Sequence, residues 1–170
     1  MRIAVDAMGG DHAPQAIVAG AVQALAHVSA DTTIVLVGDE TRLQDALGGS
    51  VPDRIEISHA SQVVEMSESP ATAIRRKRDS SIARALEMVK EGKADAVFSA
   101  GNTGAAVAGA ALKLRTLAGV SRPAIATVFP TPTKPFVLLD AGANTDSNAR
   151  MLAEFALMGE VYSRDILGVV

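Results

Sequence analysis

Short apolar runs alternate with longer segments of helical spacing along this chain of 170 residues. Runs at 3–5, 33–37, 54–57 and 94–98 have the length and composition of strands. A turn or a segment with apolar side chains at helical spacing follows each run. Helices are expected at 13–27, 40–47, 80–91 and 103–117. This alternation predicts a three-layer α/β/α fold with a mostly parallel sheet.

The last third of the chain adds two more expected strands and a helix. The strands lie at 124–128 and 136–139, separated by the proline-rich turn 130–135, and the helix lies at 148–163. Residues 1–170 together are predicted to form a single α/β domain. Residues 61–79 carry no clear pattern, and a segment of that length predicts a functional or mobile loop. The apolar end, 166–170, suggests a truncated chain whose open apolar surface drives self-association.

Composition excludes several kinds of chemistry. The chain has no cysteine, so it offers no thiolate nucleophile, disulfide or cysteine-ligated zinc. Its net charge of −3 argues against nucleic-acid binding through a general basic surface. No metal-ligand constellation, dinucleotide fingerprint or triphosphate-binding loop is present, and no cofactor is expected. No apolar run reaches the roughly 18 residues of a membrane span, so a cytoplasmic protein is predicted.

A small-residue turn, Ser99–Gly104, follows the expected strand 94–98 and opens the expected helix. Backbone N–H groups and the positive helix end would converge there on one spot, which suits phosphate. Gly101 and Gly104 would let the backbone approach the ligand, and Asn102 and Thr103 would add side-chain donors. The alternative is an ordinary strand-to-helix turn with Asn102 or Thr103 as the N-cap.

Two other strand ends carry similar turns, and parallel strands bring such turns to one edge of a sheet. The turn after the first strand contains Asp6, Gly9, Gly10, Asp11 and His12. Its carboxylates would orient a substrate and its histidine would move a proton, unless Asp11 is simply a helix cap. The turn 140–144 offers Asp140 and Asn144 to the same edge, or is a plain glycine turn.

Four consecutive cations, Arg75, Arg76, Lys77 and Arg78, precede the expected helix 80–91. Cations are disfavoured at a helix start by the helix dipole, so this run favours a ligand or partner. The alternative is a solvated charge run.

These segments together resemble, in order, the bacterial phosphate acyltransferase (PlsX) family of fatty acid and phospholipid synthesis. The matching pieces cover essentially the whole chain and are 3–14, 66–70, the basic run into 79–81, 99–105, 140–144 and 155–159. The resemblance implies a phosphotransacetylase-like fold. It also implies transfer of an acyl group from acyl carrier protein to inorganic phosphate, which forms acyl phosphate for phospholipid synthesis.

The resemblance further implies a homodimer at the cytoplasmic face of the membrane. Family members continue past residue 170, and the missing part would add strands, one wall of the cleft and the apolar segment that meets the membrane. The candidate residues are catalytic Asp6, His12, Asn102, Asp140 and Asn144; phosphate-binding Ser99, Gly101, Asn102, Thr103 and Gly104; and substrate- or carrier-binding Gly9, Gly10, Asp11, Arg75, Arg76, Lys77 and Arg78. The alternatives are an inactive anion-binding fragment and a phosphotransacetylase that uses coenzyme A thioesters.

Overall fold

The computed structural model describes residues 1–169, which divide into two compact units. The first unit is Met1–Arg115 and the second begins at Thr116. We describe each by itself, and their membership of a single domain stays a prediction. In the described residues, no helix combines the length and the apolar character that a membrane crossing requires. Nor do three or more His, Asp or Glu side chains gather there as metal ligands.

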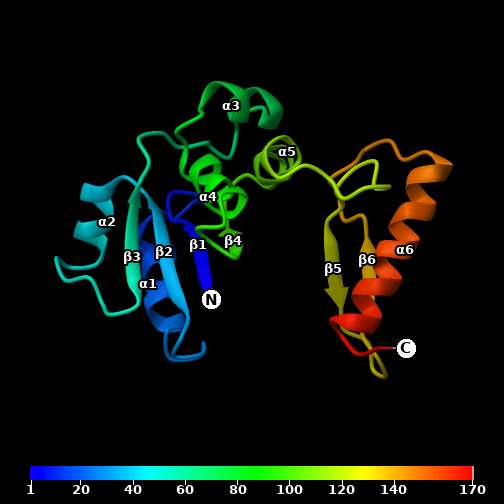
Figure 1. Cartoon of the computed structure of the whole chain (residues 1–170), viewed down its shortest axis with the longest axis horizontal. Coiled ribbons are helices and arrows are strands. Elements are labelled where there is room, and N and C mark those ends of the chain that lie inside the picture. The colour runs from blue at the N-terminus through cyan, green and yellow to red at the C-terminus, as the bar shows by residue number, and fades with distance from the viewer. Residues whose placement is uncertain (170) are drawn as a thin grey trace. The chain divides into compact units, whose positions relative to one another are not determined.

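The first unit is built on a four-stranded parallel sheet with the order β3-β2-β1-β4 (Figure 1). The strands are β1 (Arg2–Asp6), β2 (Thr33–Gly38), β3 (Ile55–His59) and β4 (Ala96–Ser99). The helices are α1 (Gln15–Ala24), α2 (Glu40–Ala46), α3 (Pro70–Arg76), α4 (Ser81–Lys90) and α5 (Thr103–Lys113). The predicted parallel α/β fold is confirmed in this unit.

Side chains of the two central strands alternate between two cores, because successive residues of a strand face opposite sides of the sheet. Val5 and Leu36 join the core under α1 and α2. Ala4 and Val35 join the core under α4. A third core lies among α3, α4 and α5. Helical layers therefore cover both faces of the sheet, and all four strands run toward one carboxyl edge.

Helix α3 lies in the segment for which the sequence predicted no structure. Pro70 occupies its first turn, where a missing N–H costs nothing, and Ala73 and Ile74 are buried. Helix α3 has seven residues, as α2 has, but it does not directly follow a strand, so the alternation of strands and helices that indicated α2 did not reveal it. It lies past the carboxyl ends of the strands (Figure 1).

The second unit contains β5 (Ala126–Phe129), β6 (Phe136–Leu139) and α6 (Ala149–Asp165). The two strands pair antiparallel, with the rings of Phe129 and Phe136 stacked at 5.4 Å. Met151 and Phe155 are the buried residues of α6. The antiparallel pairing fits the 130–135 connection, which is too short for the crossover of a dozen or more residues that parallel strands require.

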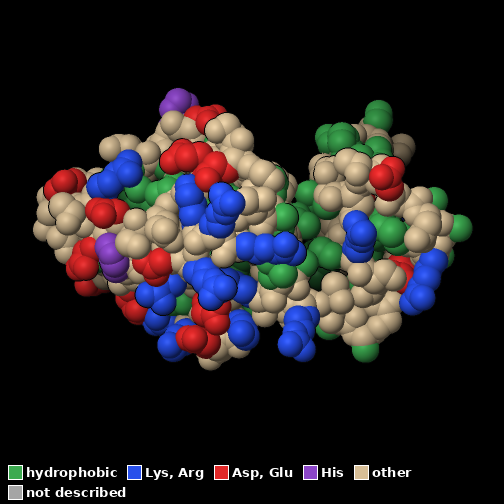
Figure 2. Space-filling model, turned by 90° about the horizontal axis from the view of Figure 1, so that it is seen from above, with side chains coloured by type: hydrophobic (Ala, Val, Ile, Leu, Met, Phe, Trp, Pro, Cys, Tyr) green, Lys and Arg blue, Asp and Glu red, His purple; other side chains and the backbone are tan. Residues whose placement is uncertain are grey.

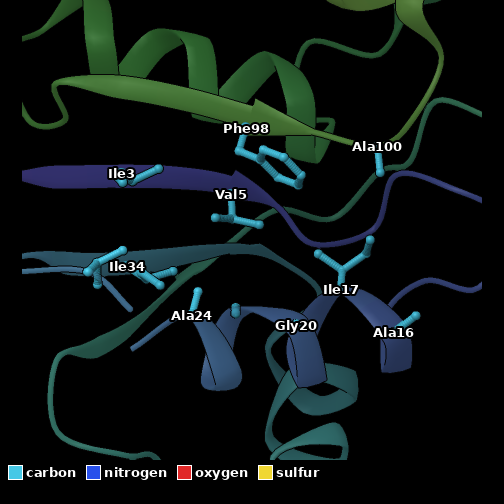
Figure 3. Close-up of a pocket in the computed structure, with 11 residues that line it drawn as sticks. Ile3, Val5, Ala16, Ile17, Gly20, Ala24, Ile34, Phe98 and Ala100 are labelled. Carbon is cyan, nitrogen blue, oxygen red and sulfur yellow. The ribbon is translucent and has the colours of Figure 1, made fainter. Parts of the chain in front are cut away.

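An apolar groove of about 380 Å³ lies between α1 and the outer strand β4 (Figure 3). Ile3, Val5 and Ile34 of the sheet line it together with Ile17 and Gly20 of α1. Phe98 of β4 extends over it with 56% of its surface exposed. Among the described residues, β4 pairs with a strand on one side only, so the groove lies beside an edge of the sheet.

We expect this surface to drive concentration-dependent self-association. Phe98→Asp should weaken it by about tenfold or more, because burying an aromatic ring contributes about 1.5–3 kcal/mol. Sedimentation velocity over a range of concentrations measures the change. Leu117→Asp is the control, because Leu117 is 82% exposed and lies outside the groove. An equal effect of both substitutions would mean that the groove is not the contact.

Candidate functional site

The turns after β1 and β4 meet at the carboxyl edge of the sheet. Asp6 and Ser99 are partners in the parallel register of the two strands. The Ser99 hydroxyl donates to Asp6 Oδ2 at 2.7 Å and accepts from the Gly101 N–H at 3.1 Å. Asp6 is 3% exposed, and its Oδ1 has no hydrogen-bond partner among the described residues. The Asp6 carboxylate thus fixes the Ser99 hydroxyl, which in turn fixes the start of the turn 99–104.

Two glycines bring these turns into backbone contact. A Cβ on Gly101 would lie 2.9 Å from the Cα of Gly9, and a Cβ on Gly9 would lie 3.0 Å from the Cα of Gly101 and would collide with Asp6 Oδ2. Gly10 has φ +111°, a conformation that favours glycine, and packs on the carbonyl of Ala100. The sequence predicted that the backbone at Gly101 approaches a ligand closely. In the structure, the backbone at Gly101 closely approaches Gly9 of the first turn.

Asn102 joins the turn to the segment 65–68. Its Oδ1 accepts from the N–H of Ala105 at 2.9 Å, which makes it the N-cap of α5. Its Nδ2 donates to the carbonyls of Glu65, Met66 and Glu68 at 3.1–3.3 Å. One side chain therefore sets both the start of α5 and the course of a segment more than thirty residues earlier.

The amides of Thr103 and Gly104 remain open at the start of α5. Neither N–H has an acceptor among residues 1–169, and the side chain of Thr103 is exposed. Gly104 is needed for packing as well, because a Cβ there would lie 2.5 Å from Cγ of Pro70 in α3. The structure thus leaves two donors and a positive helix end beside the contact of the glycine turns.

Asp11 and His12, the other polar residues predicted in the first turn, lie in a different environment from the buried Asp6. Asp11 and His12 are both exposed, and neither side chain makes a hydrogen bond within the described chain. Pro14, not Asp11, stands at the N-cap of α1.

The basic run lies mainly at the end of a helix. Arg75 and Arg76 occupy the last turn of α3, where the dipole favours cations, so the expected conflict with a helix start is wrong for them. Lys77 pairs with Glu68 and donates to the carbonyl of Val63 at 2.6 Å. Arg75, Arg76 and Arg78 are exposed. Figure 2 views the molecule from above, the side on which α3 lies in Figure 1, and shows several Lys and Arg side chains gathered on that face.

Asp140 and Asn144 lie in the second unit and hold its hairpin closed. Asp140 Oδ1 accepts from the amides of Ile125 at 2.7 Å and Ala143 at 3.2 Å. Its Oδ2 accepts from the backbone N–H of Asn144 at 2.7 Å and from Nδ2 at 2.9 Å. Burial raises the pKa of Asp140, but these hydrogen bonds outweigh burial and hold the pKa below its ordinary value.

A polar hollow beside the glycine turns contains Arg42, a residue that no sequence pattern singled out. Its volume is about 390 Å³, and Arg42 of α2, Glu65, Met66 and Ser67 line it together with Gly10 and Asp11. An arginine on an exposed helix has no distinguishing sequence pattern. Only the fold brings α2, the first turn and the segment 63–67 together.

Asn102→Ala should lower the free energy of unfolding by about 2–4 kcal/mol, because it removes a cap and leaves backbone carbonyls without their donor. Asn148 is a matched control, since it caps α6 through the N–H of Met151 at 3.0 Å. Asn148→Ala should cost only about 1 kcal/mol. Chemical denaturation measures both, and hydrogen exchange should quicken at 65–68 in Asn102→Ala alone. Equal losses without faster exchange would contradict the double role.

The second unit should lose a stabilising contribution in acid. Because the folded-state pKa of Asp140 is lowered, its contribution is complete above the ordinary value of 3.8 and disappears as pH falls through the folded-state value. Asp140→Asn should therefore unfold at a lower temperature at pH 7, with the gap to the unchanged chain closing below pH 3.8. Fluorescence of Tyr162, the chain's single tyrosine, follows this unit. Asp146→Asn is the control, and a gap that persists in acid would refute the expectation.

The profile of the fatty acid synthesis protein family matches residues 1–170. The chain is 51% identical to the phosphate acyltransferase of Desulfitobacterium hafniense strain Y51 over 99% of this chain and 50% of that protein. It is 49% identical to that of Geobacillus thermodenitrificans strain NG80-2, over 99% of this chain and 51% of that protein. The chain thus spans about half the length of the relatives it matches.

Solved structures show the same fold at low sequence identity. A phosphotransacetylase from Streptococcus pyogenes superposes with a TM-score of 0.74 at 20% identity, covering 99% of this chain and 55% of that one. The EutD phosphotransacetylase from Staphylococcus aureus gives 0.67 at 19% identity, covering 99% and 54%. The predicted phosphotransacetylase-like fold is confirmed, and the match along the whole sequence shows that the chain belongs to the fatty acid synthesis protein (PlsX) family.

Proposed function

We propose that this chain carries the phosphate-binding part of a phosphate acyltransferase. An oxygen of inorganic phosphate attacks the thioester carbonyl of acyl carrier protein, a C–O bond forms, the C–S bond breaks, and acyl phosphate and the free thiol of the carrier result. The nucleophile is supplied by the substrate, so the protein needs no serine or cysteine nucleophile. Its task is to hold phosphate beside the carbonyl and to stabilise the developing oxyanion.

The open amides of Thr103 and Gly104 are the observation that carries this proposal. They lie at the positive end of α5, within a turn that Ser99 and Asn102 fix by hydrogen bonds. Donors fixed before the ligand arrives need no reorganisation when they bind an anion. The proposed reaction is that of the family, and the open amides of the turn support phosphate binding at the start of α5.

Two parts of the proposal rest on surface charge and on the family. Arg75, Arg76 and Arg78 are exposed cations that suit the acidic surface of a carrier protein. Arg75 and Arg76 lie in the last turn of α3, where the helix dipole favours a cation by only about 0.3–1 kcal/mol, so their substitution should change stability little. A homodimer that works at the inner face of the membrane completes the proposal.

Phosphate titration followed by backbone amide NMR tests the site in this chain. We expect saturable shifts at the amides of Thr103 and Gly104. The matched control is the start of α6, where Ala149 and Arg150 follow the cap Asn148. If phosphate moved the amides of α5 and α6 equally, its binding would be a general helix-end effect and the proposed site would be refuted.

Acyl transfer is tested by trapping acyl phosphate with hydroxylamine. The chain, and the same chain extended to the length of its relatives, receive phosphate with either acyl carrier protein thioesters or coenzyme A thioesters. Product from the carrier thioester supports the proposal, and we expect it mainly from the extended chain. Product from coenzyme A alone would identify a phosphotransacetylase. Phosphate binding without product from either form would identify an anion-binding protein without this activity.

A further inference from the structure

The side chain of His59 reaches from the end of β3 to the start of α2. Its Nδ1 accepts a hydrogen bond from the backbone N–H of Glu40 at 3.3 Å. Glu40 is the first residue of α2, so this N–H has no acceptor within its own helix. The N–H of Arg42 is capped locally, by Oδ1 of Asp39 at 2.9 Å. Two side chains thus cap α2, and one of them comes from a strand of the sheet.

The bond from Glu40 to His59 requires a neutral imidazole ring. A ring nitrogen accepts a hydrogen bond when it carries no proton, and in imidazolium both nitrogens are donors. A positive charge beside the start of a helix is also disfavoured, because the helix dipole is positive there. Histidine side chains ordinarily gain their proton between about pH 5 and 8. A proton on Nδ1 of His59 would therefore break this cap and repel the start of α2.

The start of α4 offers the protonated ring a second partner, the carboxylate of Asp79. Its Oδ2 accepts from the N–H of Ser61 at 2.9 Å and from the Ser61 hydroxyl at 2.5 Å, and its Oδ1 pairs with Nε of Arg84 at 2.7 Å. The hydrogen bonds from Ser61 hold the pKa of Asp79 below its ordinary value, and the charges of Arg84 and His59 lower it further. A charged carboxylate within electrostatic reach of His59 favours the protonated ring.

The other carboxylates next to His59 belong to the start of α2 and are directed to groups of that helix. Asp39 Oδ1 accepts from the N–H of Arg42, and Glu40 Oε1 accepts from Nε2 of Gln44 at 3.3 Å. On the side of α4, Arg84 repels a protonated ring, but its guanidinium is paired with Asp79. Asp79 is therefore the anion that a protonated His59 would approach.

We propose that His59 is a pH-sensitive contact that exchanges α2 for the start of α4. When the ring is neutral, Nδ1 holds the N–H of Glu40. When Nδ1 takes a proton from solvent, the hydrogen bond to Glu40 breaks and the imidazolium pairs with Asp79. The first turn of α2 then loosens, while the buried Leu43 keeps the rest of the helix on the sheet. Arg42 lies in this first turn and lines the polar hollow, so one wall of the hollow becomes sensitive to pH.

The exchange joins elements on opposite faces of the sheet. Leu43 of α2 belongs to the core on one face, and Ala85 of α4 belongs to the core on the other. Both elements lie in the first unit, and His59 stands between them at the carboxyl end of β3. A single proton at His59 can therefore shift a contact from one face of the sheet to the other.

Amide and imidazole NMR of the chain between about pH 8 and 5 tests this inference. The neutral ring of His59 should carry its proton on Nε2, which the nitrogen shifts of the ring report. The amide shift of Glu40 should follow the titration of the ring, and its protection from hydrogen exchange should fall about fivefold in acid, because one hydrogen bond is lost. The amide of Met151 is the internal control, since it bonds the side-chain amide of Asn148, which has no proton to gain.

Three variants separate the contact from a general effect of acid. His59→Gln should abolish the pH dependence at Glu40. His27→Gln is the matched control and should leave it unchanged, because His27 is exposed and its side chain makes no hydrogen bond within the described chain. Asp79→Asn should move the titration of the His59 ring to lower pH, because an attracting charge is lost.

Three results would overturn the proposal. The first is a neutral ring that carries its proton on Nδ1. The second is a Glu40 amide that does not follow the ring, or that still titrates in His59→Gln. The third is an unchanged ring titration in Asp79→Asn, which would remove Asp79 as the second partner.

Discussion

The side chain of Asn102 is the interaction on which the candidate site depends. Its oxygen caps α5 and its nitrogen donates to three carbonyls of the segment 65–68. The Nδ2 group has only two hydrogens, so the three carbonyls share them. The backbone of the segment 65–68 therefore curves around the Nδ2 atom of Asn102. Without this contact, the start of α5 and one wall of the polar hollow would be independent of each other.

A second layer of support lies below the turns. Asp6 is buried at the end of β1 and acts on the site through Ser99, whose hydroxyl receives the N–H of Gly101. The chain thus places polar side chains predicted to be catalytic in positioning contacts: Asp6 under the turn, Asn102 at the cap, and Asp140 and Asn144 inside the hairpin of the second unit. The open donors that remain for a ligand are backbone amides, which no side-chain pattern in the sequence displays.

The alternation of apolar runs with segments of helical spacing predicted most elements of the first unit. It also predicted that the turns after β1 and β4 meet, since parallel strands bring their carboxyl ends to one edge. Helix α3 was missed because its seven residues are stabilised by packing against other helices, as the contact of Gly104 with Pro70 shows. Arg42 was missed because only the fold brings it beside the other residues of the polar hollow, which come from distant parts of the chain.

The contact of Gly9 with Gly101 limits how the descendants of this sequence can vary. Elsewhere in a protein, an enlarged side chain can be accommodated when its neighbour becomes smaller. Here the neighbour of each glycine is the backbone Cα of another glycine, which has no side chain left to lose. A second substitution at the partner position therefore provides no compensation, and both positions can drift only if the two strand-end turns move apart.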